Sequence, residues 1–381
     1  MRILIATVTA GAGHVQAAAA LEEAWRALRP RDALQRLDVL SFTPRLYRKV
    51  YVDGYVKIVE HAPELYAHVF KKTDNPALVK KLTRFRRTLA HLTTNKFVTQ
   101  LRKFKPDAVL CTHYLPLEIL AHLRARKSKA LAPMTVSIIT DFEAHALWME
   151  AGVDLYCVAA EETKARLVAR GAPEESVAVT GIPISAKFSA DVDVPESRKR
   201  MGLRDDLPIL LVLSGGFGLG PVAEILAEVD KLPMTVQVLV VCGRNQELRA
   251  KLALQERRQP TRILGFVSNM HELMAIAEIV ISKPGGLTTS EALAVGKPLF
   301  VLNPIPGQEA ANSDFLLEHG AAAKANRVED LPYRLEKLLG SSKLSEMAAA
   351  ARSLARPDAA VEICRAVIHR LDKSPRLAEA L

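Results

Sequence analysis

The feature that most constrains the fold is a pattern of strand, glycine turn and helix that occurs in both halves of the chain. In the first half, an apolar run (residues 2–8) leads into Gly11-Ala12-Gly13-His14, and an Ala-rich amphipathic segment follows. In the second half, the apolar run 209–213 leads into the glycine-rich residues 214–220 and a further amphipathic segment. Each pattern is typical of a strand–turn–helix unit. A chain of 381 residues also exceeds one ordinary core, so we expect two domains.

Short apolar runs alternate with helical patterns through the rest of both halves. This alternation predicts an α/β fold with a parallel, doubly wound sheet in each domain. The polar stretch 183–200 contains two prolines and is interpreted as a linker between domains 1–182 and 201–355, with 356–381 as a C-terminal helix and tail. The two sheets are expected to face an interdomain cleft, because ligands of such sheets bind at the carboxyl ends of strands. Further strands are predicted at 108–111, 135–139, 155–159, 177–180, 236–242, 279–282 and 298–302.

One segment accounts for the whole basic excess of the chain. The net charge is +10, and residues 44–105 contain fifteen Lys or Arg against four Asp or Glu. The segment also contains four of the seven tyrosines. Basic and amphipathic aromatic side chains together suit an anionic lipid surface. No nucleic-acid module accompanies the charge, so we expect no nucleic acid as partner, although a merely solvated basic face is the alternative.

The sequence predicts a cytoplasmic protein that is peripheral on the inner face of the cell membrane. No apolar stretch approaches the roughly 18 residues that a membrane span requires. The N-terminal apolar run is too short for an export signal. Four widely spaced cysteines at positions 111, 157, 242 and 364 are expected to be buried free thiols.

Two motifs in the second half are suited to a nucleotide sugar. In residues 282–292, a strand ends and a helix begins at Gly285-Gly286-Leu287-Thr288-Thr289, which is typical of an anion site. Glu291 could accept the hydroxyls of a ribose, or be an ordinary acid near a helix start. In residues 304–312, two prolines precede Gln308 and Glu309, which could bind sugar hydroxyls or cap the next helix.

Two motifs in the first half provide candidate catalytic groups. His14 follows the first strand and is a candidate general base, although a loop histidine is more often a surface residue. The motif Thr140-Asp141-Phe142-Glu143-Ala144-His145-Ala146-Leu147-Trp148 also follows an apolar strand. Asp141 could assist the base and Trp148 could cover an apolar acceptor; the alternative is a capping Asp with a core Trp. Asp191 and Asp193 have the spacing of a metal-binding pair but lie in the expected linker, so we expect no metal cofactor.

Taken together, these motifs resemble the diacylglycerol glycosyltransferases, a family that contains monogalactosyldiacylglycerol synthase and the processive diacylglycerol glucosyltransferases. The peptidoglycan lipid-linked N-acetylglucosamine transferase is related. The resemblance implies a GT-B fold with the acceptor in the first domain and a UDP-sugar in the second. It implies acceptor contacts from Gly13, His145 and Trp148. It also implies donor contacts to uracil, ribose, diphosphate and hexose from Phe266, Val267, Glu291, Ser214, Gly215, Gly216, Gly286, Leu287, Thr288, Thr289, Gln308 and Glu309.

The function expected from these observations is transfer of a hexose, with inversion, from UDP-glucose or UDP-galactose to diacylglycerol. His14 and Asp141 are the expected catalytic residues. The alternatives are an N-acetylglucosamine transferase acting on a polyprenyl-linked precursor, a UDP-N-acetylglucosamine 2-epimerase and a non-catalytic UDP-sugar sensor.

Overall fold

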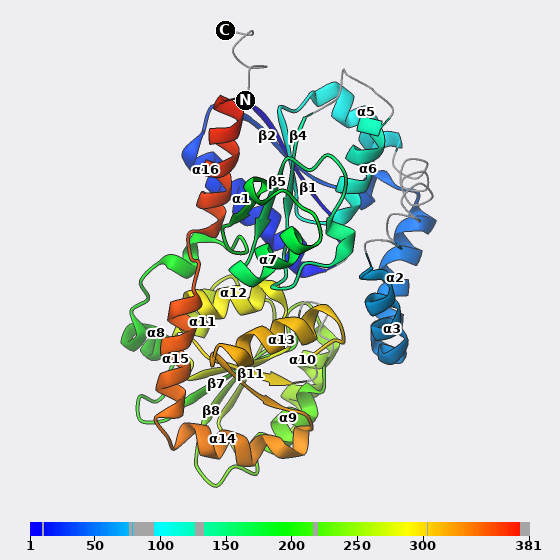
Figure 1. Cartoon of the computed structure of the whole chain (residues 1–381). Coiled ribbons are helices and arrows are strands. Elements are labelled where there is room, and N and C mark those ends of the chain that lie inside the picture. Colours follow the sequence, from blue (N-terminus) through cyan, green and yellow to red (C-terminus); the bar gives the residue numbers. More distant parts are fainter. Residues whose placement is uncertain are drawn as a thin grey trace. The chain divides into compact units, whose positions relative to one another are not determined.

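The computed structural model describes residues 1–9, 11–75, 78, 95–125, 133–215, 220–302 and 304–373, which form two compact units (Figure 1). The first unit comprises Met1–Ala186, Pro306–Gln308 and Asp358–Leu381. The second comprises Lys187–Ile305 and Glu309–Pro357.

The first unit contains a parallel sheet with the strand order β2-β1-β3-β4-β5-β6. Strand β1 pairs with β2 on one side and with β3 on the other, so the direction of strand succession reverses between β1 and β3. A ligand of such a sheet binds at the carboxyl ends of the strands beside this reversal. The strands are β1 (Arg2–Thr7), β2 (Ala33–Asp38), β3 (Ala108–Cys111), β4 (Met134–Ile138), β5 (Leu155–Val158) and β6 (Val177–Val179).

Helices cover both faces of this sheet because alternate residues of each strand point to opposite sides. Ile3 and Ile5 pack with α1 (Ala12–Leu28) and α16 (Ala359–Asp372), whereas Leu4 and Ala6 pack with α5 (Asn95–Phe104) and α6 (Tyr114–Ala125). Burial on both faces explains why the central strands are almost entirely apolar. The remaining elements are η1 (Val39–Phe42), α2 (Arg45–His61), α3 (Pro63–Thr73), η2 (Ala146–Trp148), α7 (Glu161–Ala169) and η3 (Glu174–Ser176).

The second unit repeats the plan with the strand order β12-β11-β10-β7-β8-β9, again all parallel. Here the reversal lies between β7 and β10. Leu210 and Val212 of β7 pack against α9 (Val222–Val229) and α14 (Leu331–Leu339) on one face. The strands are β7 (Ile209–Leu213), β8 (Gln237–Val241), β9 (Thr261–Leu264), β10 (Ile279–Ser282), β11 (Leu299–Leu302) and β12 (Ala322–Ala325). The other elements are η4 (Ala186–Ser189), α8 (Val194–Arg200), α10 (Gln246–Ala253), α11 (Met270–Ile276), α12 (Gly286–Ala294), α13 (Gln308–Glu318), η5 (Val328–Asp330) and α15 (Lys343–Leu354).

The boundaries between the units differ from the predicted ones. Lys187 onward belongs to the second unit, so most of the predicted linker 183–200 lies there and includes α8. Asp193 caps this helix by accepting a hydrogen bond from Glu196 N at 3.0 Å, and Arg198 pairs with Glu278 at 2.9 Å. Helix α16 belongs to the first unit, where its apolar face packs with α1 and the sheet. All four cysteines are buried and free, which confirms that prediction.

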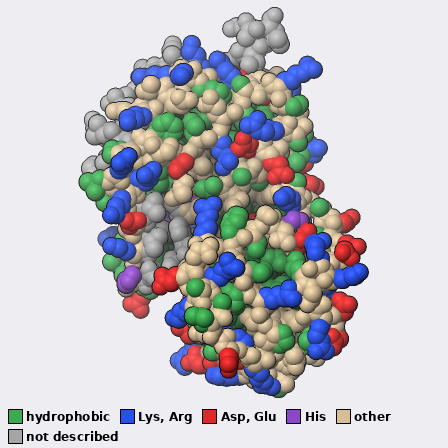
Figure 2. All heavy atoms as spheres, turned by 180° about the vertical axis from the view of Figure 1, so that it is seen from behind, with side chains coloured by type: hydrophobic (Ala, Val, Ile, Leu, Met, Phe, Trp, Pro, Cys, Tyr) green, Lys and Arg blue, Asp and Glu red, His purple; other side chains and the backbone are tan. Residues whose placement is uncertain are grey.

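Helices α2 and α3 expose apolar and basic side chains together. Leu46, Val50, Leu65 and Val69 are 73, 65, 56 and 49% exposed. In Figure 2, blue basic and green apolar side chains lie side by side along the left edge, where these helices are found. Within the described ranges, no helix is long and apolar enough to span a bilayer. Part of the predicted lipid-binding segment 44–105 lies outside the described residues. The exposed basic residues of the two helices are Arg45, Arg48, Lys49, Lys57, Lys71 and Lys72.

Candidate active site

The strand reversal of the first unit brings two histidines together. His14 lies in the first turn of α1, directly after β1, and His113 lies directly after β3. Their rings meet edge to face with centroids 4.8 Å apart. His14 was a predicted site residue, whereas sequence reasoning missed His113. The signal for His113 was its place after a predicted strand, but only the strand order shows that β3 lies beside β1.

Polar contacts hold His14 at both its ring and its backbone. Its Nδ1 lies 3.1 Å from the hydroxyl of Thr140, and its carbonyl accepts a hydrogen bond from the Thr112 hydroxyl at 3.0 Å. Burial lowers the pKa of His14 to about 4, against a smaller opposite effect of the Thr112 backbone. The ring is therefore neutral at pH 7 and can accept a proton, as a general base requires.

Aromatic side chains surround the two histidines. The Trp148 ring lies 6.4 Å from each histidine ring, and the Tyr114 ring lies 4.1 Å from that of His113. The hydroxyls of Tyr114 and Tyr51 are 2.8 Å apart, which connects α2 to this wall. Burial and the charge of His14 lower the pKa of His113, because two adjacent imidazolium ions repel each other. The group combines one candidate base with an apolar lining, which suits a lipid alcohol.

Three other residues of the first unit were predicted to act on or bind the acceptor. Gly13 lies in the first turn of α1, where Gly11 at the N-cap provides no side-chain hydrogen bond. Asp141 is half-buried and follows Thr140, the hydrogen-bond partner of His14; its assistance to the base stays a prediction. His145 is buried, with Nδ1 accepting from Leu147 N at 3.1 Å and Nε2 lying 3.0 Å from the Phe70 carbonyl. Both of its ring nitrogens thus contact protein, and its role in acceptor binding stays a prediction.

In the second unit, β7 and β10 are neighbours in the sheet, so the loops that follow them lie side by side. These are the two loops predicted to bind the diphosphate, residues 214–216 and 285–289. Ser214 and Gly215 follow β7, and α12 begins at Gly286 after β10. Gly215 has φ +77, a left-handed conformation that favours glycine. Gly216, the next predicted residue, lies outside the described residues. A small hollow beside these loops is lined by Leu213, Gly220, Pro221, Val222, Ile225, Ile281, Ser282, Lys283 and Leu302.

The first turn of α12 presents backbone N–H groups without a side-chain cap. Gly285 is the N-cap and provides no side-chain hydrogen bond. The hydroxyls of Thr289 and Ser214 are buried without a partner in the described part of the chain. Free amides at a helix start, with unpaired hydroxyls nearby, are suited to phosphate oxygens. Leu287 and Thr288 complete this turn, as predicted for the diphosphate site.

Glu291 lies one turn further along α12 and is the most perturbed acid of the site. Burial raises the pKa of its carboxyl to about 8. Among the residues that the structure describes, no side chain or backbone group pairs with this carboxylate. Glu291 is half-buried, and an acid with a raised pKa and no protein partner beside a helix start is a candidate ligand-binding group.

The loop before α13 brings Glu309 to the same region of the second unit. One Glu309 oxygen accepts a hydrogen bond from Ile305 N at 2.7 Å, and the other lies 3.9 Å from where a Cβ on Gly285 would sit. Burial raises the pKa of Glu309, opposed by the Ile305 N–H group and the charge of Lys283. Glu309 therefore orders its own loop, as the capping alternative expected. Gln308 is the first residue of α13, and the binding of hexose by both residues stays a prediction.

Phe266 and Val267, the predicted uracil contacts, follow the carboxyl end of edge strand β9. Phe266 is 63% exposed, and the guanidinium of Arg244 lies 5.5 Å from the centre of its ring. Arg244, which follows β8, was not predicted as a site residue.

Asn312 of α13 holds the turn before α12. Its Nδ2 donates to the Pro284 carbonyl at 3.0 Å in a buried position. We expect Asn312→Ala to lower the free energy of unfolding by about 1–3 kcal/mol, because the carbonyl loses a buried partner. Denaturant unfolding measures this, with Gln255→Ala on the surface as control. A loss below about 0.5 kcal/mol would show that another group replaces the amide.

Comparison with known proteins matches both halves of the chain to glycosyltransferase families. Residues 14–184 match the monogalactosyldiacylglycerol (MGDG) synthase family, and residues 209–364 match the glycosyltransferase family 28 C-terminal domain. The processive diacylglycerol beta-glucosyltransferase of Bacillus mycoides is 31% identical over 398 residues, covering 100% of this chain and 98% of the relative.

Solved structures agree on the fold. MurG of Acinetobacter baumannii has a TM-score of 0.58 and 16% identity, covering 96% of this chain and 99% of its own. The Anabaena protein HepE, solved with UDP-glucose, has a TM-score of 0.57 and 15% identity, covering 98% and 100%. The two six-stranded parallel sheets define a GT-B fold. The family matches of both halves identify the protein as a glycosyltransferase. The chain belongs to the diacylglycerol glycosyltransferase family.

Proposed function

We propose that this protein transfers a hexose from UDP-glucose or UDP-galactose to diacylglycerol at an anionic membrane surface, with inversion at the anomeric carbon. The observation that most supports this lies at the carboxyl ends of β7 and β10 in the second unit. There, the start of α12 has no side-chain cap, and the hydroxyls of Ser214 and Thr289 and the carboxyl of Glu291 have no partner among the described residues. The family relatives, which are diacylglycerol glucosyltransferases by name, favour diacylglycerol as acceptor.

In the proposed reaction, the acceptor hydroxyl attacks the anomeric carbon as the bond to the UDP oxygen breaks. Neutral His14 takes the hydroxyl proton, with Thr140 orienting its ring. The departing diphosphate gains one unit of negative charge, which the first turn of α12 stabilises through its N–H groups and helix dipole. We propose that this turn takes the place of a metal ion.

The experiment that tests the function offers radiolabelled UDP-glucose, UDP-galactose and UDP-N-acetylglucosamine separately with diacylglycerol vesicles. Thin-layer chromatography of the extracted lipid then shows which sugar is transferred. Labelled glycolipid from one of the two hexoses supports the proposal. Transfer from UDP-N-acetylglucosamine alone, or to polyprenyl phosphate alone, would instead indicate the peptidoglycan-type activity.

Vesicle binding is expected to depend on Lys71 and Lys72, which are exposed at the end of α3 beside Val69. Each basic residue near an anionic surface contributes about 1 kcal/mol, so replacing both lysines by glutamine should weaken binding to phosphatidylglycerol vesicles about thirtyfold. Binding should also weaken as salt rises. Co-sedimentation measures both effects, with Lys251→Gln in α10 as control. If neither salt nor the two substitutions changes the affinity for vesicles, insertion of the exposed apolar side chains of α2 and α3 dominates binding.

A further inference from the structure

Helix α3 has one face toward solvent and another against the acceptor side of the first unit. Leu65 and Val69 are exposed on the outer face. On the inner face, the Phe70 ring lies 4.4 Å from the His145 ring, and the Phe70 carbonyl lies 3.0 Å from His145 Nε2. The helix that would touch lipid on one side is therefore fixed to the segment 140–148 on the other.

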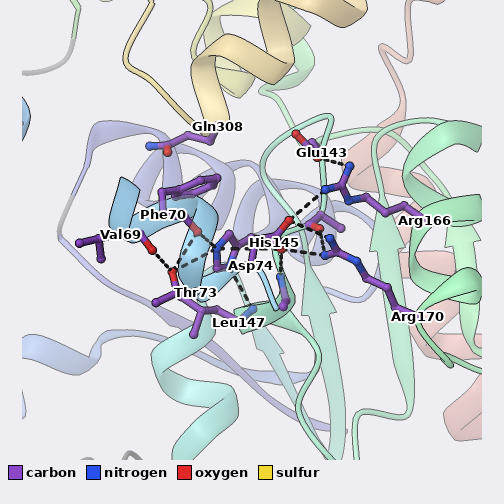
Figure 3. A network of polar contacts seen from close by, with 12 residues as sticks. Val69, Phe70, Thr73, Asp74, Glu143, His145, Leu147, Arg166, Arg170 and Gln308 are labelled. Atoms are coloured by element: carbon purple, nitrogen blue, oxygen red, sulfur yellow. Dashed lines mark hydrogen bonds and ion pairs between the residues drawn. The ribbon is translucent and has the colours of Figure 1, made fainter. Parts of the chain in front are cut away.

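Asp74, immediately after α3, is the centre of this attachment (Figure 3). Its Oδ1 accepts from Ala146 N at 2.7 Å and from Arg170 at 2.8 Å. Its Oδ2 accepts from Arg166 at 2.9 Å and again from Arg170 at 2.7 Å. One carboxylate thus joins the end of α3 to two arginines at the end of α7 and to the backbone of η2.

The two arginines continue to the same segment. Arg170 also donates to the Ala144 carbonyl at 2.9 Å, and Arg166 also pairs with the Glu143 carboxylate. With His145 contacting Phe70 and Ala146 contacting Asp74, each of four consecutive residues is joined to the end of α3 directly or through one arginine. A network with this many shared partners favours a single arrangement, because losing one member leaves partly buried charges unpaired.

The charge of Asp74 is maintained by its partners. Burial alone would raise its pKa, but the hydrogen bonds from Arg170 and the Ala146 N–H group, together with the nearby positive charges, outweigh burial and lower it. The carboxylate is therefore ionised at neutral pH and able to hold both arginines.

The segment fixed by Asp74 contacts the candidate base at both ends. At one end, the Thr140 hydroxyl lies 3.1 Å from His14 Nδ1. At the other end, the Trp148 ring lies 6.4 Å from the His14 ring. A displacement of residues 143–146 would alter both contacts, and catalysis depends on such positions at the scale of 1 Å.

We propose that Asp74 is a positioning residue that connects the seating of α3 on anionic lipid to the placement of Thr140 and Trp148 against His14. This proposal rests on the proposed function and extends it: lipid binding would organise the acceptor site as well as bring the enzyme to its substrate.

The test compares Asp74→Asn with the wild-type protein. Asparagine can still accept the Ala146 hydrogen bond but no longer balances two arginines. We expect kcat with diacylglycerol in phosphatidylglycerol vesicles to fall about tenfold or more, with KM for the UDP-sugar and the affinity for vesicles unchanged. If Asp74 only stabilised the fold, Asp74→Asn would have a lower unfolding temperature but the wild-type kcat per UDP-binding site. That result would overturn the proposal.

Asp154→Asn is the matched control. Asp154 also accepts from an arginine, Arg124, at 2.6 Å and from a backbone amide, Thr135 N, at 2.7 Å. Asp154 lies at the amino end of β5, whereas His14 lies beyond the carboxyl end of β1 in the same parallel sheet. We expect this variant to keep the wild-type kcat.

Hydrogen exchange gives a readout that does not require sugar transfer. In the wild type, phosphatidylglycerol vesicles should slow amide exchange in α2, α3 and residues 140–148. In Asp74→Asn, protection should persist in the two helices and be lost in residues 140–148. Equal protection of residues 140–148 in both proteins, or none in the wild type, would overturn the proposal. If these exchange patterns are found but no glycolipid forms, the proposed reaction fails while the connection through Asp74 stands.

Discussion

Replacing His14 by alanine is expected to reduce turnover by about 10²–10⁴-fold while leaving the affinity for UDP unchanged. The imidazole is the titratable group at the carboxyl end of β1, and its burial keeps it neutral and able to accept the acceptor proton. The proposed diphosphate contacts lie in the second unit, so calorimetric titration with UDP should give the wild-type dissociation constant. His369→Ala, an exposed histidine on α16, is the matched control.

The pH dependence of the wild type should identify the same group. Because burial lowers the pKa of His14 to about 4, the base stays unprotonated as the pH falls past the ordinary imidazole value of about 6.5. We expect kcat at saturating UDP-sugar, which reports groups of the bound enzyme, to show no inflection near that value and to decline only near pH 4. Unchanged turnover in His14→Ala would remove His14 from the mechanism. An inflection near 6.5 that vanishes in this variant would mean that His14 is solvated in the working enzyme.

Glu291→Ala is expected to weaken UDP binding about 10- to 100-fold, because hydrogen bonds to a charged group contribute about 1.5–3 kcal/mol. With a pKa of about 8, the free carboxyl is mostly protonated at pH 7. If the ribose hydroxyls donate to the carboxylate, they favour its charged form, so binding should release close to one proton. Titration calorimetry in buffers of different ionisation enthalpy measures that proton, with Glu247→Gln on α10 as control.

The same carboxyl should reduce stability in the absence of ligand. Its pKa is higher in the folded than in the unfolded state, so the folded state binds the proton more tightly. Stability is therefore lost as pH rises from about 4.5 toward 8. Glu291→Gln should then raise the free energy of unfolding at pH 7 by about 1–3 kcal/mol, with the gain disappearing below pH 4.5. Unaltered UDP affinity and no proton release would exclude Glu291 from the ribose site.

The residues of the proposed donor site lie closer together in the sequence than those of the proposed acceptor site. Most of the proposed diphosphate contacts come from one strand end, one glycine turn and one helix start within residues 282–291, and only Ser214, Gly215 and Gly216 come from elsewhere. The proposed acceptor site draws His14, Tyr51, His113, Thr140 and Trp148 from four separate segments. No spacing in the sequence indicates that these residues meet.

The central strands were predicted from the sequence, whereas three edge strands were not. The central strands were predicted because both of their faces are buried and their sequences are continuously apolar. Three strands were missed: β2 (ALQRLD), β9 (TRIL) and β12 (AAKA). Each lies at an edge of its sheet, where half-exposed residues tolerate charge and the apolar pattern weakens.

The sequence alone determined the two α/β units, the glycine turn and helix start at residues 285–289 and the basic aromatic character of residues 44–105, because each depends on residues that are close together along the chain. Only the tertiary structure decided which strand ends are neighbours, and hence that His113 lies against His14. It also decided that Asp74 joins α3 to residues 143–146, because the partners of a partly buried charge are chosen by packing between elements up to 96 residues apart.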